Sequence, residues 1–336
     1  MNICVLGAGS WGSALSIVLA DNGHDVTLWT RNEDQCKQIN EKRTNERYLK
    51  NVFFCDHIRA TMDLKGAIQN KDVVVIAIAS QAIRSVLEQT SGSIKADQIV
   101  VNVSKGIEIG SLKRVSEIVS EFYPKVKFVS LSGPSHAEEV AAKLPTTLVS
   151  SSEDLKAAEL IQDLFITEYL RIYTNMDIVG VELGGALKNI IALGAGISDG
   201  MGFGDNSKAA LMTRGIREIS ILGEKMGADM SSFSGLSGIG DLIVTCTSMH
   251  SRNRRCGILI GEGMAVDAAV DKIGMVVEGI YTIRSAYDLS LKYNVEMPIT
   301  HALYQVVYES FDAREAVKAL MSRAKKHEME AKFRFV

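Results

Sequence analysis

The sequence predicts an α/β fold: a mostly parallel, doubly wound sheet in the first part of the chain, followed by a mainly helical domain. A glycine-rich turn joins the first apolar strand to a helical pattern, and short β-branched runs then alternate with helical stretches. From Val181, long helix-period segments replace the strands. The 336 residues also exceed the size at which one core usually keeps growing. We therefore predict two domains, residues 1–180 and 181–336.

The first strand and the first helix enclose the glycine turn. Residues 2–6 are apolar and strand-like, the turn is Gly7-Ala8-Gly9-Ser10-Trp11-Gly12, and a helical pattern follows up to Asn22-Gly23. Gly7 permits the tight turn, Gly9 lets the backbone approach a pyrophosphate, and Gly12 lets the helix pack closely on the strand. Because amides at the helix N-terminus also face the anion, this segment predicts a Rossmann-type dinucleotide site.

The remaining elements continue the alternation. Apolar runs predict strands at residues 26–30, 73–79, 99–103, 128–131, 147–150 and 170–173. Such a sheet binds ligands at the carboxyl ends of its strands, so residues that follow strands are the candidates for a site. In the second domain we expect a Gly- and Ser-rich loop at residues 231–240. An amphipathic terminal helix is expected at 312–326, with apolar Val317, Leu320 and Met321 among many charges.

Composition and charge restrict the function classes. Apolar residues make up 46% and charged residues 23% of the chain, and the net charge of -3 argues against a nucleic-acid binder. Five scattered cysteines without a C-x-x-C favour reduced thiols, and the spacing of Cys246, His250 and Cys256 matches no common zinc site. The first strand leaves no room for a leader, and the longest apolar run, residues 73–79, is too short to span a membrane. We expect a cytoplasmic protein without a metal or membrane insertion.

The end of the second strand indicates which nicotinamide cofactor binds. NAD-selective folds place an acidic residue there to accept the ribose 2′-hydroxyl. This chain has Thr30-Arg31, and an arginine can pair with a 2′-phosphate, so NADPH is favoured over NADH. The alternatives are a solvated Arg31, or a longer strand that lets Glu33 or Asp34 take the ribose. The second alternative would allow the use of both cofactors.

Two lysines occupy positions where catalytic groups are expected. Lys105 follows the strand at residues 99–103, and Lys188 stands among the glycines and apolar residues of 181–196, which favour close helix packing. A lysine that faces a carbonyl oxygen can donate a proton as hydride arrives, and a partly dry cleft lowers its pKa. A lone loop lysine such as Lys105 is usually solvated. An unpaired charge at Lys188 would be costly.

The second domain carries two further polar segments. Asp241 precedes an apolar run, where a carboxylate either caps a helix or orients a buried ammonium. The segment Ser251-Arg252-Asn253-Arg254-Arg255 is a short basic loop in a slightly acidic protein. Such a loop is either surface charge or, at Arg252 and Asn253, a grip on a substrate phosphate.

Residues 132–138 close a strand and open a helix. Ser135 and Glu138 have the spacing of a capping box, and free amides from Gly133 to Ala137 would also face the cleft. His136 has no identifiable acid or nucleophile partner, so it has no assigned role.

Together these segments resemble the bacterial NAD(P)-dependent glycerol-3-phosphate dehydrogenases, from the glycine turn nearly to the C-terminus. The most specific likeness is Gly185-Ala186-Leu187-Lys188-Asn189-Ile190-Ile191-Ala192, continued by Gly196, Asp199-Gly200 and Gly204-Asp205-Asn206. Residues 7–12, 104–106, 132–135, 240–241 and 251–253 agree with the other motifs. The resemblance implies reversible reduction of dihydroxyacetone phosphate to sn-glycerol 3-phosphate, which supplies glycerophospholipid synthesis.

The resemblance also implies roles for single residues. Lys188 would be the general acid/base, with Lys105 beside the substrate oxygen and Asp241 and Thr245 in the polar network. Arg252 and Asn253 would hold the substrate phosphate. The residues implied around the substrate are Lys105, Gly133, Ser135, Lys188, Asn189, Asp241, Ser251, Arg252 and Asn253. Those implied around the cofactor are Gly7, Gly9, Ser10, Trp11, Gly12, Arg31, Tyr48, Lys105, Ala137, Arg252, Val276 and Glu278.

The residues leave two other functions open. One is a different NADP-linked reductase, acting on a β-hydroxyacid or ketopantoate, whose monocarboxylate substrate would not need Arg252. The other is a nicotinamide-sensing regulatory protein that does no chemistry and has no reason to keep Lys188 in an apolar helix. The expected partners are a nicotinamide cofactor and a phosphorylated small-molecule substrate, with no nucleic acid, and a homodimer is a guess that no residue pattern supports.

Overall fold

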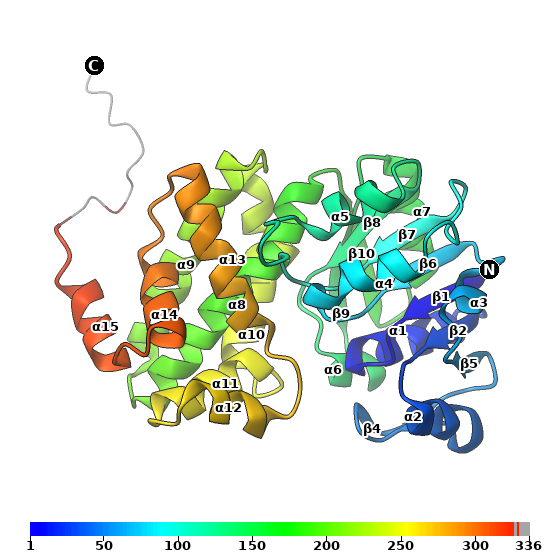
Figure 1. Cartoon of the computed structure of the whole chain (residues 1–336), viewed down its shortest axis with the longest axis horizontal. Helices are drawn as coiled ribbons and strands as arrows, with labels where there is room; N and C mark the ends of the chain where they lie inside the picture. The colour runs from blue at the N-terminus through cyan, green and yellow to red at the C-terminus, as the bar shows by residue number, and fades with distance from the viewer. Residues whose placement is uncertain (326–327, 329–336) are drawn as a thin grey trace.

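The structure is a computed structural model that describes residues 1–325 and 328, with a sheet domain beside a helical domain (Figure 1). Eight strands form one sheet in the order β10-β9-β8-β7-β6-β1-β2-β5, and each neighbouring pair is parallel except β8 and β9. The strands are β1 (Asn2–Leu6), β2 (Asp25–Trp29), β5 (Ile58–Thr61), β6 (Val73–Ile76), β7 (Ile99–Asn102), β8 (Lys127–Ser132), β9 (Thr146–Ser151) and β10 (Leu170–Asn175). The predicted fold class is confirmed.

Burial on both faces explains why these segments form strands. Every residue of β6 and β7 is buried, and most are β-branched, as suits a central parallel strand. Helices α1, α6 and α7 pack on one face of the sheet and α3, α4 and α5 on the other. Their bounds are α1 (Ser10–Asp21), α3 (Leu64–Ile68), α4 (Ile83–Gln89), α5 (Val115–Phe122), α6 (Ala137–Ala141) and α7 (Leu155–Phe165), with a 3-10 turn, η2 (Ser80–Ala82), before α4.

The strand order places the ligand-binding edge of the sheet. The order reverses at β1, which pairs with β2 on one side and β6 on the other, so the point where such sheets bind ligands lies at the carboxyl ends of β1 and β6. No pattern in the sequence predicted the elements between β2 and β5. They are α2 (Glu33–Lys37), a π-type turn η1 (Gln38–Lys42), and a hairpin of β3 (Thr44–Asn45) and β4 (Leu49–Phe53). These elements lack the apolar run that marked the other strands: no residue of α2 is buried, β3 has two residues, and β4 exposes three of its five.

Helix α8 (Ile178–Gly200) is the centre of the helical domain. Among the described residues it is the one helix long and apolar enough to cross a membrane, yet nearly all of it is buried inside the protein. The expectation that residues 73–79 are the longest apolar run is therefore wrong. Helix α8 is the longer apolar segment, although Glu182 and Lys188 interrupt it, because its other residues are mostly apolar or glycine. The other helices are α9 (Asp205–Lys225), α10 (Asp241–Thr247), α11 (Arg252–Gly261), α12 (Val266–Ile273), α13 (Glu278–Tyr293), α14 (Pro298–Tyr308) and α15 (Ala313–Met321).

Glycines bring α8 and α11 into backbone contact. A Cβ atom on Gly196 would lie 2.0 Å from the carbonyl oxygen of Arg254, and one on Gly261 would lie 2.3 Å from that of Ile197. No larger residue fits at either position without separating the helices. The close packing predicted from the glycines of α8 is confirmed, and it holds the first turn of α11 beside the middle of α8.

Two predictions for the second domain are wrong in detail. Residues 231–240 are a 3-10 turn, η3 (Met230–Ser234), and a π-type turn, η4 (Leu236–Gly240), because the Asp229 carboxylate accepts the amide of Ser231 and starts the first turn. The terminal helix α15 ends at Met321, which is 83% exposed, and Lys326 lies outside the described residues.

The domain border predicted between residues 180 and 181 falls in the first turn of α8.

Candidate active site

The carboxylate of Asp241 holds two lysines that come from different domains. Lys105, in the segment after β7, donates a hydrogen bond to one oxygen at 2.6 Å, and Lys188, on α8, donates to the other. Lys188 also donates to Thr245 Oγ1 at 2.6 Å, and Lys105 donates to the carbonyl oxygen of Gly133 at 3.0 Å. The four residues implied as catalytic therefore form one contact network across the domain junction.

Burial sets the electrostatics of this network. The side chains of Asp241, Lys188 and Lys105 are 1%, 7% and 18% exposed. Burial lowers the pKa of Lys188 to about 7, while the Asp241 carboxylate opposes the shift and the Lys105 ammonium adds to it. Of the two roles open for Asp241, the structure shows contact with ammonium groups and no side-chain cap on α10. An amine with this pKa exchanges its proton near neutral pH.

The glycine turn has the space and the amides that a pyrophosphate needs. Gly7 has a φ of +115°, and a Cβ there would lie 2.5 Å from the carbonyl oxygen of Ala77. A Cβ on Gly12 would lie 2.0 Å from the Gly7 oxygen, whereas one on Gly9 would meet nothing within 4 Å. No side chain caps the N-terminus of α1. The open space at Gly9 and the uncapped amides fit a dinucleotide phosphate.

Two side chains that no sequence motif marks support the glycine turn. Gln35 and Asn45 both donate to the carbonyl oxygen of Ala8, at 2.6 and 2.9 Å. Asn45 also donates to Ser13 Oγ at 2.8 Å. The segment from α2 to β4 thus folds back onto the turn. These contacts join residues 27 and 37 positions apart, and no motif or periodicity connects them.

The end of β2 presents an arginine rather than an acid. The strand ends at Trp29, and the Arg31 side chain just beyond it is exposed. Glu33 belongs to the helix α2, where it pairs with Lys37 at 2.7 Å, so the strand does not run on to the acidic residues. Tyr48 is half-buried in the turn between β3 and β4.

Glu278, the first residue of α13, links the helical domain to the segment that follows β6. Its carboxylate accepts the amide of Ser80 at 3.0 Å and the Ser80 hydroxyl at 2.6 Å. Burial raises the pKa of this carboxyl, which the hydrogen bonds from Ser80 oppose. Arg252 donates to the carbonyl oxygen of Val276 at 3.2 Å, and its charge also acts on Glu278. Three residues implied around the cofactor thus lie together, and Ser80 is a partner that the sequence did not reveal.

Two buried amides join α8, α11 and α13. Asn253 donates to the side-chain oxygen of Asn189 at 2.9 Å and accepts the amide of Gly279 at 2.8 Å. Ser251 caps α11 by accepting the amide of Arg254 at 3.2 Å. No hydrogen bond between described residues joins Lys188 to Arg252. Their chain neighbours Asn189 and Asn253 nevertheless bring both residues to the same region of the α8–α11 contact.

The segment 132–138 does not form the predicted capping box. Helix α6 begins at Ala137 with His136 at the cap position, so Glu138 is its second residue rather than its third. The Ser135 hydroxyl instead donates to the carbonyl oxygen of Gly133 at 2.9 Å. His136 Nε2 is buried and has no hydrogen-bond partner among the described residues. Burial, and then the charge of Lys188, lowers the pKa of His136, so the ring is neutral at physiological pH.

Comparison with known proteins decides the family. Residues 2–158 match the family model for the NAD-dependent glycerol-3-phosphate dehydrogenase N-terminus, and residues 177–318 match the model for its C-terminus. The chain belongs to this dehydrogenase family. It is 54% identical over 331 residues to the NAD(P)+ glycerol-3-phosphate dehydrogenase of Bacillus velezensis, with 98% of this chain and 96% of the relative covered.

Other relatives agree with this membership. The NAD(P)+ glycerol-3-phosphate dehydrogenase of Bacillus subtilis strain 168 is 53% identical, over 98% of this chain and 96% of its own. A crystal structure of the glycerol-3-phosphate dehydrogenase from Coxiella burnetii is 37% identical, with a TM-score of 0.93 over 96% of this chain and 99% of that one. As a member of the family, the protein is an NAD(P)-dependent oxidoreductase that interconverts dihydroxyacetone phosphate and glycerol 3-phosphate. This assignment replaces the two alternatives that the sequence left open, a ketopantoate-type reductase and a nicotinamide-sensing protein.

The Asp241 network generates a stability prediction. In Asp241→Asn, Lys105 and Lys188 face each other without a carboxylate, so the free energy of unfolding falls by about 3 kcal/mol. The loss is larger at pH 6 than at pH 9, because removing the carboxylate lowers the pKa of Lys188 further and only its protonated form is penalised. Urea denaturation at both pH values measures this. In the control Asp288→Asn, a surface pair with Arg284 is lost and the change stays below about 0.5 kcal/mol. Equal losses in the two variants would contradict the prediction.

Proposed function

We propose that the Asp241 network is the catalytic centre for dihydroxyacetone phosphate reduction, with Lys188 as the general acid. The observation that carries this proposal is a buried ammonium of lowered pKa, held by Asp241 and Thr245 at the junction of the two domains. General acids work best when their pKa lies near the working pH. In the reverse direction the neutral amine of Lys188 accepts the proton of the alcohol.

In this mechanism the two lysines act at the central carbonyl of the three-carbon substrate, and the residues of α11 act at its phosphate. The substrate ketone oxygen accepts hydrogen bonds from Lys188 and Lys105, and Lys188 transfers its proton to that oxygen as the carbonyl carbon is reduced. NAD(P)H, when bound, supplies the hydride. Asp241 keeps both amines oriented, and Thr245 fixes the Lys188 ammonium from a second direction. Lys188 then regains a proton, which a pKa of about 7 allows at neutral pH.

The phosphate end would be held at the start of α11. Arg252 offers a guanidinium fork that matches phosphate oxygens, and Ser251 and Asn253 flank it. Asn189, hydrogen-bonded to Asn253, lies next to Lys188 in the chain, which supports a site that spans both ends of the substrate. Gly133 and Ser135 would border the substrate from the sheet domain.

The cofactor would lie along the carboxyl edge of the sheet. Its pyrophosphate would lie at Gly7, Gly9 and Gly12, where open space and uncapped amides support this assignment. The contacts that the family resemblance adds are Ser10, Trp11, Arg31, Tyr48, Lys105, Ala137, Arg252, Val276 and Glu278. We infer a preference for NADPH from Arg31, since the acids that would favour NADH lie on α2. Cytoplasmic location, a homodimer and a supply of glycerophospholipid precursor are further expectations of this proposal.

The direct test is an absorbance assay at 340 nm with purified protein and dihydroxyacetone phosphate. Oxidation of NADPH at a higher kcat/KM than NADH is the expected result. Loss of absorbance with ketopantoate but not with dihydroxyacetone phosphate would overturn the proposal.

Lys188→Ala tests the general acid. We expect kcat to fall at least about 100-fold, because a positioned acid contributes about that much or more. In the unchanged protein, the rate of ketone reduction falls as pH rises through about 7, where Lys188 loses its proton, whereas the rate of alcohol oxidation rises over the same interval. Lys318→Ala, at an exposed lysine of α15, is the control and keeps kcat within twofold. Near-normal turnover by Lys188→Ala would remove the assigned role.

Arg252→Ala tests the phosphate site. The KM for dihydroxyacetone phosphate should rise about tenfold or more, since a lost charge-assisted contact costs at least roughly 1.5 kcal/mol. The affinity for NADPH should change only modestly, as measured by fluorescence titration. The control is Arg284→Ala, whose guanidinium pairs with Asp288 on the same helix α13. A KM within a factor of about two of the unchanged protein would contradict the assignment.

Arg31→Ala tests the cofactor preference. The ratio of kcat/KM for NADPH to that for NADH should fall about fivefold, a smaller loss than for a buried pair because the side chain is exposed and screened. Arg59→Ala, at an exposed arginine on the neighbouring strand β5, should leave the ratio unchanged. If both variants keep the original ratio, Arg31 does not select the cofactor.

A further inference from the structure

The segment that carries Lys105 has no regular structure of its own. Residues 103–114, between β7 and α5, contain no helix or strand. Its position is nevertheless fixed, because the Ile107 side chain is buried in the core of the helical domain. The carbonyl oxygen of Ile107 accepts a hydrogen bond from Gln81 at 2.9 Å and one from Ser285, on α13, at 3.1 Å. Lys105 thus lies two residues from an anchor between the domains.

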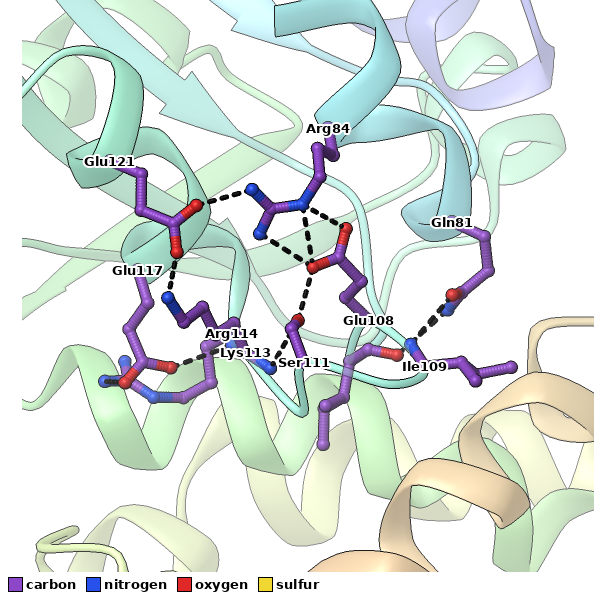
Figure 2. A network of polar contacts seen from close by, with 10 residues as sticks. Gln81, Arg84, Glu108, Ile109, Ser111, Lys113, Arg114, Glu117 and Glu121 are labelled. Atoms are coloured by element: carbon purple, nitrogen blue, oxygen red, sulfur yellow. Dashed lines mark hydrogen bonds and ion pairs between the residues drawn. The ribbon is translucent and has the colours of Figure 1, made fainter. Parts of the chain in front are cut away.

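Gln81 and Arg84 hold this segment from the sheet domain, on consecutive elements η2 and α4. Gln81 uses both ends of its amide, since it donates to Ile107 and accepts the amide of Ile109 at 2.9 Å. Arg84 binds Glu108, which lies between Ile107 and Ile109. Its Nε and Nη2 donate to the Glu108 carboxylate in three contacts of 2.9, 3.1 and 2.8 Å (Figure 2). The Glu108 side chain is 11% exposed, so this pair is partly desolvated.

We propose that Gln81 and Arg84 are positioning residues for Lys105: their clamp on residues 107–109 keeps the Lys105 ammonium against Asp241. This inference rests on the proposed function, in which Lys105 faces the substrate oxygen. A lysine has a flexible four-carbon side chain. On a mobile loop, its ammonium would be free to turn into solvent. Fixing the backbone two residues away removes part of that freedom before substrate binds.

The rest of the polar network in Figure 2 stabilises the far end of the segment. Lys113 pairs with Glu121, and Arg114 donates its amide to Glu117 at 2.8 Å. Arg84 also contacts Glu121, at 2.5 Å. Lys113 and Arg114 thus join the segment to α5, Arg84 joins α4 to α5, and within the segment the Ser111 hydroxyl donates to Glu108. Glu121 therefore offers a control in which Arg84 loses an ion pair but keeps its hold on Glu108.

Loss of the clamp has a second consequence, at Lys188. The ionisable groups that act on Lys188 are Asp241 and Cys246 on α10, Lys105 on the clamped segment, and His136 before α6. The Lys105 ammonium repels the Lys188 ammonium and lowers its pKa, whereas the Asp241 carboxylate raises that pKa. If Lys105 moves away, the repulsion is lost and the attraction to Asp241 remains. The pKa of Lys188 then rises, and the fall in ketone reduction moves to higher pH. A role of Arg84 in stability alone would not move this profile.

The first experiment compares variants of the clamp. Arg84→Ala should lower kcat about tenfold, leave the Kd for NADPH within twofold, and shift the midpoint of the pH profile upward. Arg84→Lys, which keeps the charge but loses the fork, should recover part of kcat. Glu108→Gln keeps the side-chain size, removes the same pair, and should reproduce the loss if Arg84→Ala folds poorly. Glu121→Gln should keep kcat within twofold. An unchanged pH profile in both Arg84→Ala and Glu108→Gln would overturn the inference.

The second experiment is a double-mutant cycle with Lys105→Ala. If Arg84 acts through Lys105, then Arg84→Ala/Lys105→Ala should have the kcat of Lys105→Ala alone. If the two losses instead multiply, Arg84 acts independently of Lys105 and the inference fails, while the proposed function stands. If Lys105→Ala alone keeps full kcat, the role proposed for Lys105 fails first, and the clamp inference falls with it.

Discussion

One buried carboxylate, that of Asp241, determines the geometry on which the site depends. Two ammonium groups and a carboxylate are removed from water there, and none could stay buried alone without a cost of several kcal/mol. Asp241 compensates both amines at once, since each of its oxygens accepts from a different lysine. Because Lys105 belongs to the sheet domain and Lys188 to the helical domain, the same interaction also fixes the two domains relative to each other.

The packing of α8 makes this arrangement possible. Gly196 and Gly200, in the last turns of α8, let α11 approach to backbone contact, and this approach holds the first turn of α11 beside the residues that follow Lys188. Helix α13 joins the same group through Gly279 and presents Glu278 to Ser80 at the edge of the sheet. The candidate site is therefore built by close helix packing on one side and by the segments that follow parallel strands on the other.

The segment after β7 is the exception, and it shows how a loop is made precise. Its backbone is held on both sides of Glu108 by Gln81, its apolar Ile107 enters the core of the other domain, and its far end is tied to α5. A loop restrained in this way loses conformational freedom on folding rather than on substrate binding. The glycine turn is restrained in the same way, because Gln35 and Asn45 donate hydrogen bonds to the Ala8 carbonyl oxygen.

The sequence by itself determined the sheet, the order of domains and the local motifs. Hydrophobic runs mark buried strands, and glycines mark places where the backbone comes close to another group, among them Gly7 and Gly196. Position along the chain also singled out Lys188, Lys105 and Asp241 as candidates, and the family resemblance added Thr245. β3 has only two residues and β5 has no run of apolar residues, so neither was predicted. The predicted capping box is absent because helix α6 begins one residue later than the pattern requires.

Only the tertiary structure decided which charges meet. Asp241 could have capped a helix, and nothing in its neighbours in the chain indicates that its partners lie 136 and 53 residues away. The partners of Glu278 and Glu108, which are Ser80 and Arg84, were equally invisible. Local sequence records burial and backbone conformation because these act over a few residues. A charge is paired by whatever the folded chain brings within about 3 Å, and that is a property of the assembled domains.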